Sequence, residues 1–224
     1  MSNANYLTTF AGIMGILPDN EPHYILITAA GLEDILEQEL QEKIPGAHLH
    51  LYPYLGGYRS VGDLPLSKLL ELRSVRRIIR VARTFEFDQR METIRKVAAE
   101  SPIPELEEAR SFRVTTSQYG PRHHKAMAIQ AAAGEVIQQR YGLPVDLKHY
   151  EANVRLDFVG DLGYIGVQVT PDKFDHRHGR EFYHQAGVRT STAYAMLRLA
   201  GLREGQTLLD PFTGGGTIPL EAAS

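Results

Sequence analysis

Residues 208–217 read LLDPFTGGGT, an apolar run and an acidic residue followed by a Pro-Phe pair and three glycines. The letters that follow, up to residue 224, are typical of the start of a helix. A strand that passes through a glycine loop into a helix is the opening unit of a doubly wound α/β domain. Glycines also let the backbone approach a ligand without intervening side chains. We therefore predict a strand at Thr207–Asp210, a helix from Thr217 onward, and a ligand-binding loop between them.

Three ligands compete for this loop. A P-loop needs Lys and Ser/Thr directly after its last glycine, whereas Gly216 is followed by Thr-Ile-Pro. A dinucleotide fingerprint that starts at Gly214 requires glycine at position 219, where Pro219 lies. S-adenosylmethionine fits better, because it carries a carboxylate that loop amides and a helix N-terminus can receive. The alternative without a ligand is a plain glycine-rich turn, which the preceding Asp-Pro-Phe disfavours.

The N-terminal half alternates between the periodicities of strands and helices. Apolar residues at helical spacing follow a β-rich run and end at Pro45-Gly46. The expected elements are a strand at 23–30, a helix at 31–46, two strands at 48–62 around Gly56-Gly57, a helix at 64–75 and a strand at 76–87. This β-α-β-β-α-β order is that of a ferredoxin-like domain.

The second half predicts a separate unit. We expect a connecting helix at 90–100, a strand at 111–120, an Ala-rich helix at 123–141, two strands across the Gly160–Gly163 turn, an extended linker at 173–189 and a helix at 192–200. The Ala-rich helix should end at Gly142, since glycine is the preferred residue just after a helix. Taken together, the chain is predicted to be an α+β protein.

The segment DPFTGGGTIPLEAA resembles the first motif of class I methyltransferases that act on exocyclic amines of nucleic-acid bases. The segments FRVTTSQYG, LPVDLKHYEANVRLDFVGDLGYIGVQVT and HRHGREFYHQAGVRT resemble a THUMP domain joined to such a methyltransferase. From about residue 23 the chain resembles the N-terminal half of the THUMP-containing RNA guanine-N2 methyltransferases, most nearly the bacterial tRNA enzymes.

This resemblance implies a division of the chain into an N-terminal extension (1–22), a ferredoxin-like domain (23–105), a THUMP RNA-binding domain (106–172), a linker (173–189) and the first βα unit of a Rossmann-like methyltransferase domain (190–224). It also implies S-adenosylmethionine as the cofactor. The implied cofactor-binding residues are Asp210, Phe212, Thr213, Gly214, Gly215, Gly216 and Thr217. Two further candidates, Thr190 and Thr192, lie where the family often has Pro-x-Leu-Ala and this chain reads Thr-Ser-Thr-Ala.

The family's amine-binding motif, Asn or Asp followed by Pro-Pro and an aromatic residue, does not occur in this sequence. The acidic residue expected about 20 residues after the loop, which would hold ribose hydroxyls, is absent as well. No catalytic residue is therefore assigned, and this chain is expected to be an inactive, truncated part of a tRNA guanine-N2 methyltransferase. The alternatives are a fragment of a 23S ribosomal RNA guanine-N2 methyltransferase and a non-catalytic THUMP module.

Two basic clusters are candidates for RNA binding, although the net charge is −3. Arg122, His123, His124 and Lys125 lie at a predicted helix start, where the helix dipole also favours phosphate. An ordinary exposed helix start is an equal alternative. Lys173, Arg177 and Arg180 are interleaved with aromatic residues that could stack on single-stranded RNA or fix the linker to the next domain. The expected partner is the acceptor end of tRNA.

Several classes of protein are disfavoured. The chain has no cysteine, which excludes disulfides and thiolate metal sites and fits a reducing cytoplasm. No apolar run reaches the roughly 20 residues that span a membrane. The histidine spacing is not that of a zinc site, so no metal is expected.

The half-built unit after Thr207 is expected to be disordered or to bury its leucines against a second copy of the chain, which would form a dimer.

Overall fold

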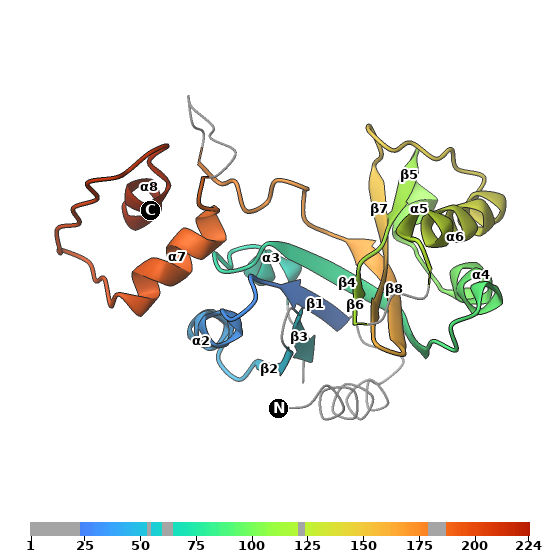
Figure 1. Ribbon diagram of the computed structural model, residues 1–224, viewed down its shortest axis with the longest axis horizontal. Coiled ribbons are helices and arrows are strands. Elements are labelled where there is room, and N and C mark those ends of the chain that lie inside the picture. Colours follow the sequence, from blue (N-terminus) through green and yellow to red (C-terminus); the bar gives the residue numbers. More distant parts are fainter. Residues whose placement is uncertain (1–22, 53–54, 60–64, 121–123, 179–186) are drawn as a thin grey trace. The chain divides into compact units, whose positions relative to one another are not determined.

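The computed structural model describes residues 23–52, 55–59, 65–120, 124–178 and 187–224. Within them the chain forms two compact units (Figure 1). Unit 1 contains Ile79–Val169 together with His23 and Tyr24. Unit 2 contains Ile25–Ile78 and Thr170–Ser224, so it combines the beginning and the end of the chain.

Unit 1 is built on a mixed sheet. In spatial order its strands are β4 (Arg77–Glu86), β8 (Leu162–Gln168), β7 (Ala152–Val159) and β5 (Phe112–Thr115), and the short β6 (Gln118–Tyr119) also pairs with β7. β8 runs antiparallel to both β4 and β7, whereas β5 and β6 run parallel to β7. The predicted hairpin is confirmed, and its turn includes Gly160 at φ +61°.

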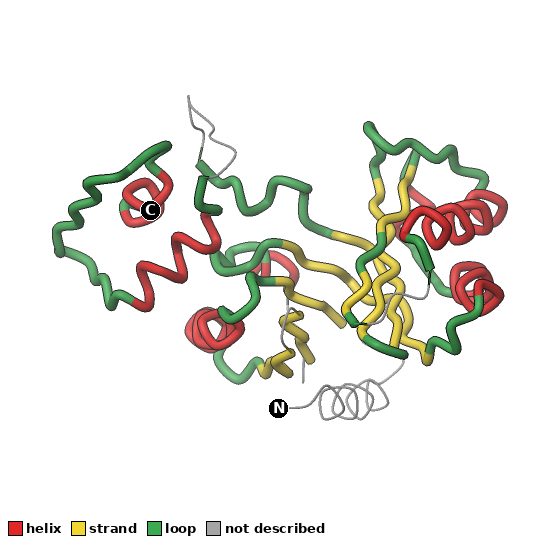
Figure 2. The backbone as a smooth tube through the Cα atoms, in the orientation of Figure 1, coloured by secondary structure: helices red, strands yellow, loops and turns green. Residues whose placement is uncertain are grey.

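One face of this sheet packs against α4 (Met91–Glu100) and α6 (Ala126–Tyr141), which Figure 2 shows in red beside the yellow strands. The core between them contains apolar residues of both layers: Ile94, Val97, Phe112, Val114, Ile129, Ile137, Val154, Leu156, Phe158 and Ile165. A short helix, α5 (Glu105–Glu108), precedes β5. Helix α6 ends at Gly142, whose φ is +68° and whose amide donates to the Gln138 carbonyl, as predicted.

Unit 2 begins at Ile25, inside β1 (His23–Ile27). The elements that follow are α2 (Glu33–Lys43), β2 (His48–Tyr52), β3 (Leu55–Arg59) and α3 (Leu66–Leu69). β2 and β3 are antiparallel, and β3 neighbours β1. The unit ends with α7 (Thr190–Leu199) and α8 (Thr217–Ala222), which pack against each other. In the described part of the chain no helix has the length and apolar character needed to cross a membrane.

Two predictions in the N-terminal half need correction. Gly56 and Gly57 do not form the hairpin turn but lie inside β3, opposite Leu51 and His50. β2 instead ends directly before Pro53, which has no amide hydrogen for the ladder. The helix expected at 64–75 is only the four-residue α3, because the buried Glu39 carboxylate accepts hydrogen bonds from the amides of Arg73 and Ser74.

The C-terminal predictions are also partly wrong. Residues 207–210 form no strand and pair with no described strand. Their apolar side chains stay accessible, and Leu209 is 85% exposed. The sequence predicts that the unit after Thr207 is either disordered or buried against a second copy of the chain; the structure forms α8 there, with Glu221 buried.

Candidate functional site

The glycine loop before α8 adopts left-handed backbone conformations at two of its glycines. Gly214 and Gly216 have φ values of +52° and +76°, which only glycine adopts without strain. A Cβ at either position would lie at least 3.7 Å from any neighbour, so the requirement is conformational rather than steric. The loop is closed by hydrogen bonds from the Gly216 amide to the Thr213 carbonyl (2.8 Å) and from the Phe212 amide to Asp210 Oδ1 (3.0 Å).

The loop presents backbone rather than charge to its surroundings. Thr213 and Gly214 are exposed, and Phe212 is 93% exposed. Thr217 is buried where α8 begins. Backbone amides and one aromatic ring are therefore the groups that this loop offers to a ligand.

The two threonines on α7 differ in availability. Thr190 is fully buried, and its hydroxyl donates to the Asp175 carbonyl oxygen. Thr192 is half-buried. Since α7 packs against α8, the structure brings these candidates into the same unit as the loop, but the Thr190 hydroxyl is already engaged.

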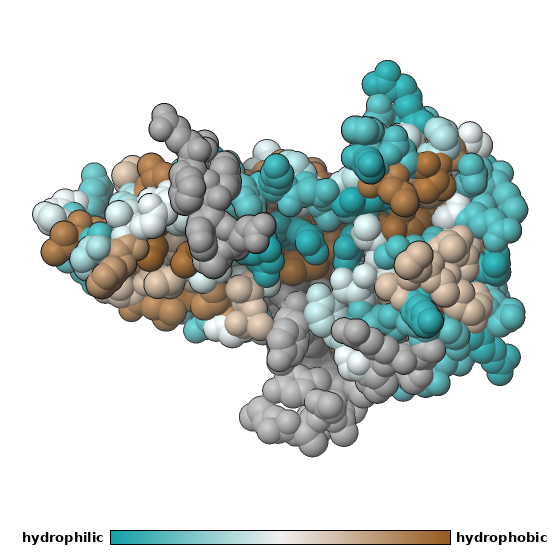
Figure 3. All heavy atoms as spheres, turned by 45° about the horizontal axis from the view of Figure 1, so that its top comes forward, coloured by the Kyte–Doolittle hydropathy of each residue, from teal (hydrophilic) through white to brown (hydrophobic). Residues whose placement is uncertain are grey.

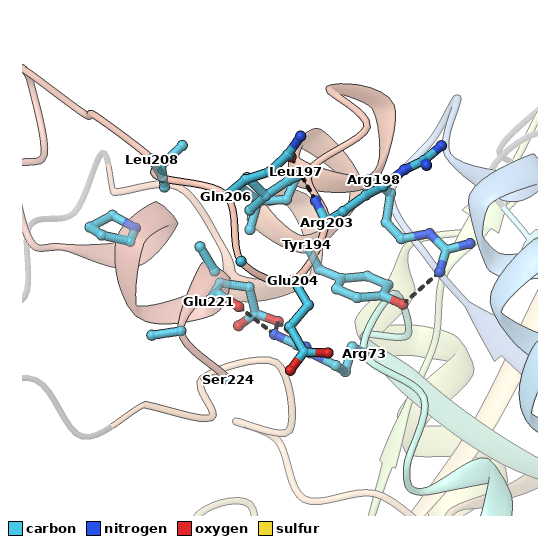
Figure 4. Close-up of a pocket in the computed structure, with 15 residues that line it drawn as sticks. Arg73, Tyr194, Leu197, Arg198, Arg203, Glu204, Gln206, Leu208, Glu221 and Ser224 are labelled. Carbon is cyan, nitrogen blue, oxygen red and sulfur yellow. Dashed lines mark hydrogen bonds and ion pairs between the residues drawn. The ribbon is translucent and has the colours of Figure 1, made fainter.

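A buried carboxylate on α8, Glu221, is the centre of an ionic cluster in unit 2 (Figure 4). It accepts hydrogen bonds from Arg73 Nε (2.9 Å), Arg177 Nη2 (2.8 Å) and His178 Nε2 (2.6 Å). Arg73 Nη2 also donates to the Glu221 backbone carbonyl at 2.6 Å. Burial raises the pKa of Glu221, but Arg177, His178 and Arg73 outweigh that effect, and the pKa is lowered from its ordinary value.

A second buried carboxylate, Asp175, fixes the linker to the start of α7. Its Oδ2 lies 3.5 Å from Arg76 Nε and 3.5 Å from Arg189 Nη1. The linker is therefore attached to unit 2 through Asp175 on one side and through the Glu221 cluster on the other.

A cavity of about 670 Å³ lies between the C-terminal part of α7, the loop after it and α8. The labelled side chains of Figure 4 surround it, among them Arg73, Tyr194 and Arg198. The Arg73 guanidinium lies 4.7 Å from the centre of the Tyr194 ring, and burial, followed by the nearby Glu39 charge, raises the pKa of Tyr194 to about 12. None of the residues predicted to bind a cofactor lines this cavity.

Exposed apolar side chains are concentrated in the C-terminal segment from Leu199 to Leu220. Figure 3 shows brown residues over the C-terminal segment at the left of the view. Leu199, Leu208, Leu209, Phe212 and Leu220 are all at least 38% exposed.

The predicted basic helix start lies in unit 1, beside an open hollow. This hollow has a volume of about 820 Å³ and is lined by Thr116, Ser117, Gln118, Tyr119, His124, Lys125 and Ala126. Lys125 is exposed directly before α6. The His124 Nε2 atom is 2.8 Å from the Gln89 carbonyl oxygen. The Thr116 hydroxyl is buried, with no hydrogen-bond partner in the part of the chain that the structure describes. Arg122 and His123 lie outside the described residues.

The linker candidates have different environments. Lys173 is exposed, whereas Arg177 contacts Glu221. Arg180 lies outside the described residues. The contact of Arg177 is the kind expected if the linker is fixed to the following domain.

Sequence reasoning missed the buried carboxylates Glu221 and Asp175, together with Arg73. Glu221 belongs to the motif that begins at Asp210, so its presence in DPFTGGGTIPLEAA was a usable signal. Nothing in the local sequence around Arg73 indicates a partner 148 residues away.

Residues 88–168 match the family model of the THUMP domain, and residues 177–224 match that of the RMKL-like methyltransferase domain. The tRNA (guanine(6)-N2)-methyltransferase of Thermus thermophilus is 35% identical over 203 residues, which are 88% of this chain and 59% of that protein. The crystal structure of TrmN from Thermus thermophilus has a TM-score of 0.75 and 32% identity, and covers 91% of this chain and 61% of its own.

A crystal structure of a methyltransferase complexed with SAH has a TM-score of 0.69 over 90% of this chain and 55% of its own. At 19% identity, this similarity concerns the fold alone. The chain thus spans 59% of the length of its curated Thermus relative.

Proposed function

This chain is a homologue of THUMP-containing tRNA (guanine-N2) methyltransferases, and we propose on that premise that it is the RNA-binding part of an enzyme that methylates a guanine N2 in tRNA. The observation that carries the proposal is the succession of a THUMP match and a methyltransferase match in one chain that aligns over 88% of its length with the Thermus tRNA enzyme. We propose the domain limits given by the sequence, 23–105, 106–172, 173–189 and 190–224, with a ferredoxin-like first domain and a cytoplasmic location.

The glycine loop is proposed as one wall of the S-adenosylmethionine site. Its residues fit that role because Gly214 and Gly216 carry no side chain, and Thr213 and Gly214 are exposed. Loop amides other than those of Phe212 and Gly216, which already donate within the loop, would receive the cofactor's carboxylate. Asp210 holds the loop through the Phe212 amide, and Phe212 offers an exposed aromatic face. When bound, the cofactor supplies the methyl group; this chain's own residues bind and orient it.

The hollow beside α6 is proposed as the RNA-binding surface of the THUMP domain. Lys125 and His124 supply cationic or hydrogen-bonding groups, and the first amides of the 16-residue α6 carry a partial positive charge. A phosphate of the tRNA acceptor end suits this combination. Arg122, His123, Lys173 and Arg180 remain proposed contacts on the basis of the sequence alone. Arg177 also remains a proposed contact from the sequence alone, because its Nη2 donates to Glu221 and its Nε and Nη1 atoms are buried.

The test is methyl transfer from labelled S-adenosylmethionine by the full-length protein to purified tRNA and to ribosomal RNA. We expect labelling of tRNA at guanine N2 and none of ribosomal RNA. Labelling of ribosomal RNA alone would replace the proposal with the ribosomal alternative. A tRNA shortened at its acceptor end should bind more weakly, and equal binding would contradict the acceptor-end assignment.

The 224-residue chain itself is expected to bind RNA weakly and to methylate nothing, because catalysis needs cofactor and amine held together in one geometry. Calorimetric titration of the chain with S-adenosylmethionine measures its affinity for the cofactor. Micromolar binding would contradict the view that this chain supplies only one wall of the site.

We also propose that the exposed leucines of the C-terminal segment associate with a second copy of the chain. Leu209 and Phe212 are 85% and 93% exposed. Sedimentation of the chain and of the L209S/F212S variant tests this, and a monomeric parent chain at high concentration contradicts it.

A further inference from the structure

A charged pair is buried on β7, outside both proposed ligand sites. Arg155 is 5% exposed and Asp157 is fully buried. The two side chains are joined by hydrogen bonds from Arg155 Nη2 to Asp157 Oδ1 (2.7 Å) and from Arg155 Nε to Asp157 Oδ2 (3.1 Å). Tyr164, on the neighbouring strand β8, is also fully buried and donates its hydroxyl to Asp157 Oδ2 at 2.7 Å.

This pair reaches the segment between β5 and β6. Asp157 Oδ1 accepts a hydrogen bond from the Ser117 amide at 2.6 Å. Arg155 donates to the Ser117 hydroxyl at 2.8 Å and to the Thr115 hydroxyl at 3.0 Å. The Ser117 carbonyl in turn accepts from the Phe158 amide at 2.9 Å. Ser117 is therefore held through its amide, its carbonyl and its side chain.

The segment held in this way forms one wall of the hollow beside α6. Thr116, Ser117, Gln118 and Tyr119 line that wall, and Lys125 also lines the hollow. Thr116, directly before Ser117, lines the hollow, and its hydroxyl is buried with no hydrogen-bond partner among the described residues.

A buried ion pair is a poor source of stability, because the loss of hydration offsets most of the attraction between the charges. Burial lowers the pKa of Arg155, but the Asp157 carboxylate outweighs it and the pKa is raised above its ordinary value. The Arg155 guanidinium thus keeps its charge in the interior. Its hydrogen bonds are directed at the loop rather than at the hydrophobic core, which indicates a role in fixing geometry.

We propose that Arg155 and Asp157 are positioning residues that hold the Thr115–Ser117 segment in the conformation that binds an RNA phosphate. This inference rests on the proposed RNA-binding function of the hollow. Neither side chain is required to touch RNA, because both act through Ser117. Tyr164 is not one of these positioning residues, because its hydroxyl contacts Asp157 Oδ2, whereas the Ser117 amide contacts Oδ1.

The test replaces the ion pair and its tyrosine by apolar residues of similar size in the variant R155M/D157L/Y164F. Apolar replacement of a buried pair is often neutral for stability, but the Ser117 amide loses its acceptor, so a modest fall in melting temperature is expected. Its affinity for labelled tRNA, measured by fluorescence anisotropy, should fall about tenfold because a charged hydrogen-bond network is lost. Amide hydrogen exchange at Ser117 should become faster, while exchange at Val154 and Leu156 stays slow.

The matched control is Tyr164→Phe, which removes one hydroxyl from the set and leaves both contacts to Ser117. It should melt at a lower temperature and bind tRNA as the parent chain does. If the triple variant does not fold, the Arg155→Lys variant tests the proposal instead. Lysine keeps the charge but lacks the planar guanidinium that reaches the hydroxyls of both Thr115 and Ser117. This variant should also bind tRNA more weakly than the parent chain.

A folded triple variant with parental affinity and slow exchange at Ser117 would overturn the proposal. Loss of affinity in Tyr164→Phe equal to that in the triple variant would do the same, because it would show a general effect of stability. If the parent chain binds no RNA, the proposed function fails, yet exchange at Ser117 still determines whether the pair holds the loop.

Discussion

Asp157 of unit 1 and Glu221 of unit 2 are both buried carboxylates, and they find their partners in different ways. Asp157 of unit 1 pairs with Arg155, two positions away on the same strand. Glu221 of unit 2 pairs with Arg177, 44 positions away, and with Arg73, 148 positions away. The first arrangement shapes a loop within one domain, whereas the second joins the beginning, the linker and the end of the chain into one unit.

The difference has an energetic consequence. Apolar residues can replace the Arg155–Asp157 pair without undoing the sheet, because the core of unit 1 lies on the helical side and is formed by side chains such as Val154 and Leu156. α8 has six residues, fewer than an isolated helix needs, and its buried positions are Thr217 and Glu221. The ionic contacts of Glu221 therefore help to attach α8 to unit 2, together with the packing of α8 against α7.

The largest expected loss of stability is that caused by the substitution Glu221→Ala. This substitution leaves Arg73 and Arg177 without their shared carboxylate, which costs about 3 kcal/mol for a buried pair. Urea denaturation of the chain measures the loss, and Glu204→Ala in the exposed loop after α7 is the control, expected to change stability by less than about 0.5 kcal/mol. Equal stability of the two variants would remove the contrast between the units.

A second prediction concerns acid. Because the pKa of Glu221 is lowered in the folded state, the stability that its ionised form contributes is present above the unfolded pKa, about 4.3. That contribution is lost as the pH falls through the folded value, since the folded carboxylate must then take up a proton.

Unfolding free energies between neutral pH and about pH 3 measure this loss, with the pH range set by the ordinary carboxyl pKa. The Glu221→Gln variant should be less stable than the parent chain at neutral pH and should lose less stability in acid. Parallel pH curves for the parent chain and the variant would contradict the lowered pKa.

The sequence predicted those elements whose causes are local. Gly142 ends α6 in the left-handed conformation, and Gly160 lies in the turn between β7 and β8, as glycine and hairpin patterns indicate. Gly214 and Gly216 have the positive φ values that a loop of three glycines suggests. In each case the residue and its structural reason lie within a few positions of each other.

The failures share the opposite property. The strand expected at Thr207–Asp210 needs neighbouring strands, and no described strand lies beside it. The helix expected at 64–75 is shortened by Glu39, a side chain more than 30 positions earlier. The Glu221 cluster could not be assembled from the sequence for the same reason, since charge patterns do not identify a partner on a distant segment.

The smallest expected effect on stability is that of removing ion pairs exposed to solvent, which differ in this from the buried pairs of Asp157 and Glu221. Arg198 and Glu42 join the end of α7 to α2, with Nη1 to Oε2 at 2.6 Å, and the Glu42 side chain is 56% exposed. Arg95 and Glu135 form a comparable exposed pair in unit 1, also at 2.6 Å.

Double-mutant cycles with R198Q/E42Q and R95Q/E135Q should each give a coupling of about 0.5 kcal/mol, because solvent screens both pairs. High salt should reduce both couplings. The sequence separation of the first pair is 156 residues and that of the second is 40. If the cycles agree, separation along the chain adds nothing by itself, and the weight of Glu221 comes from its burial. A coupling several times larger for Arg198–Glu42 would instead mean that joining distant segments is itself stabilising, and unit 2 would then depend on its exposed contacts as well.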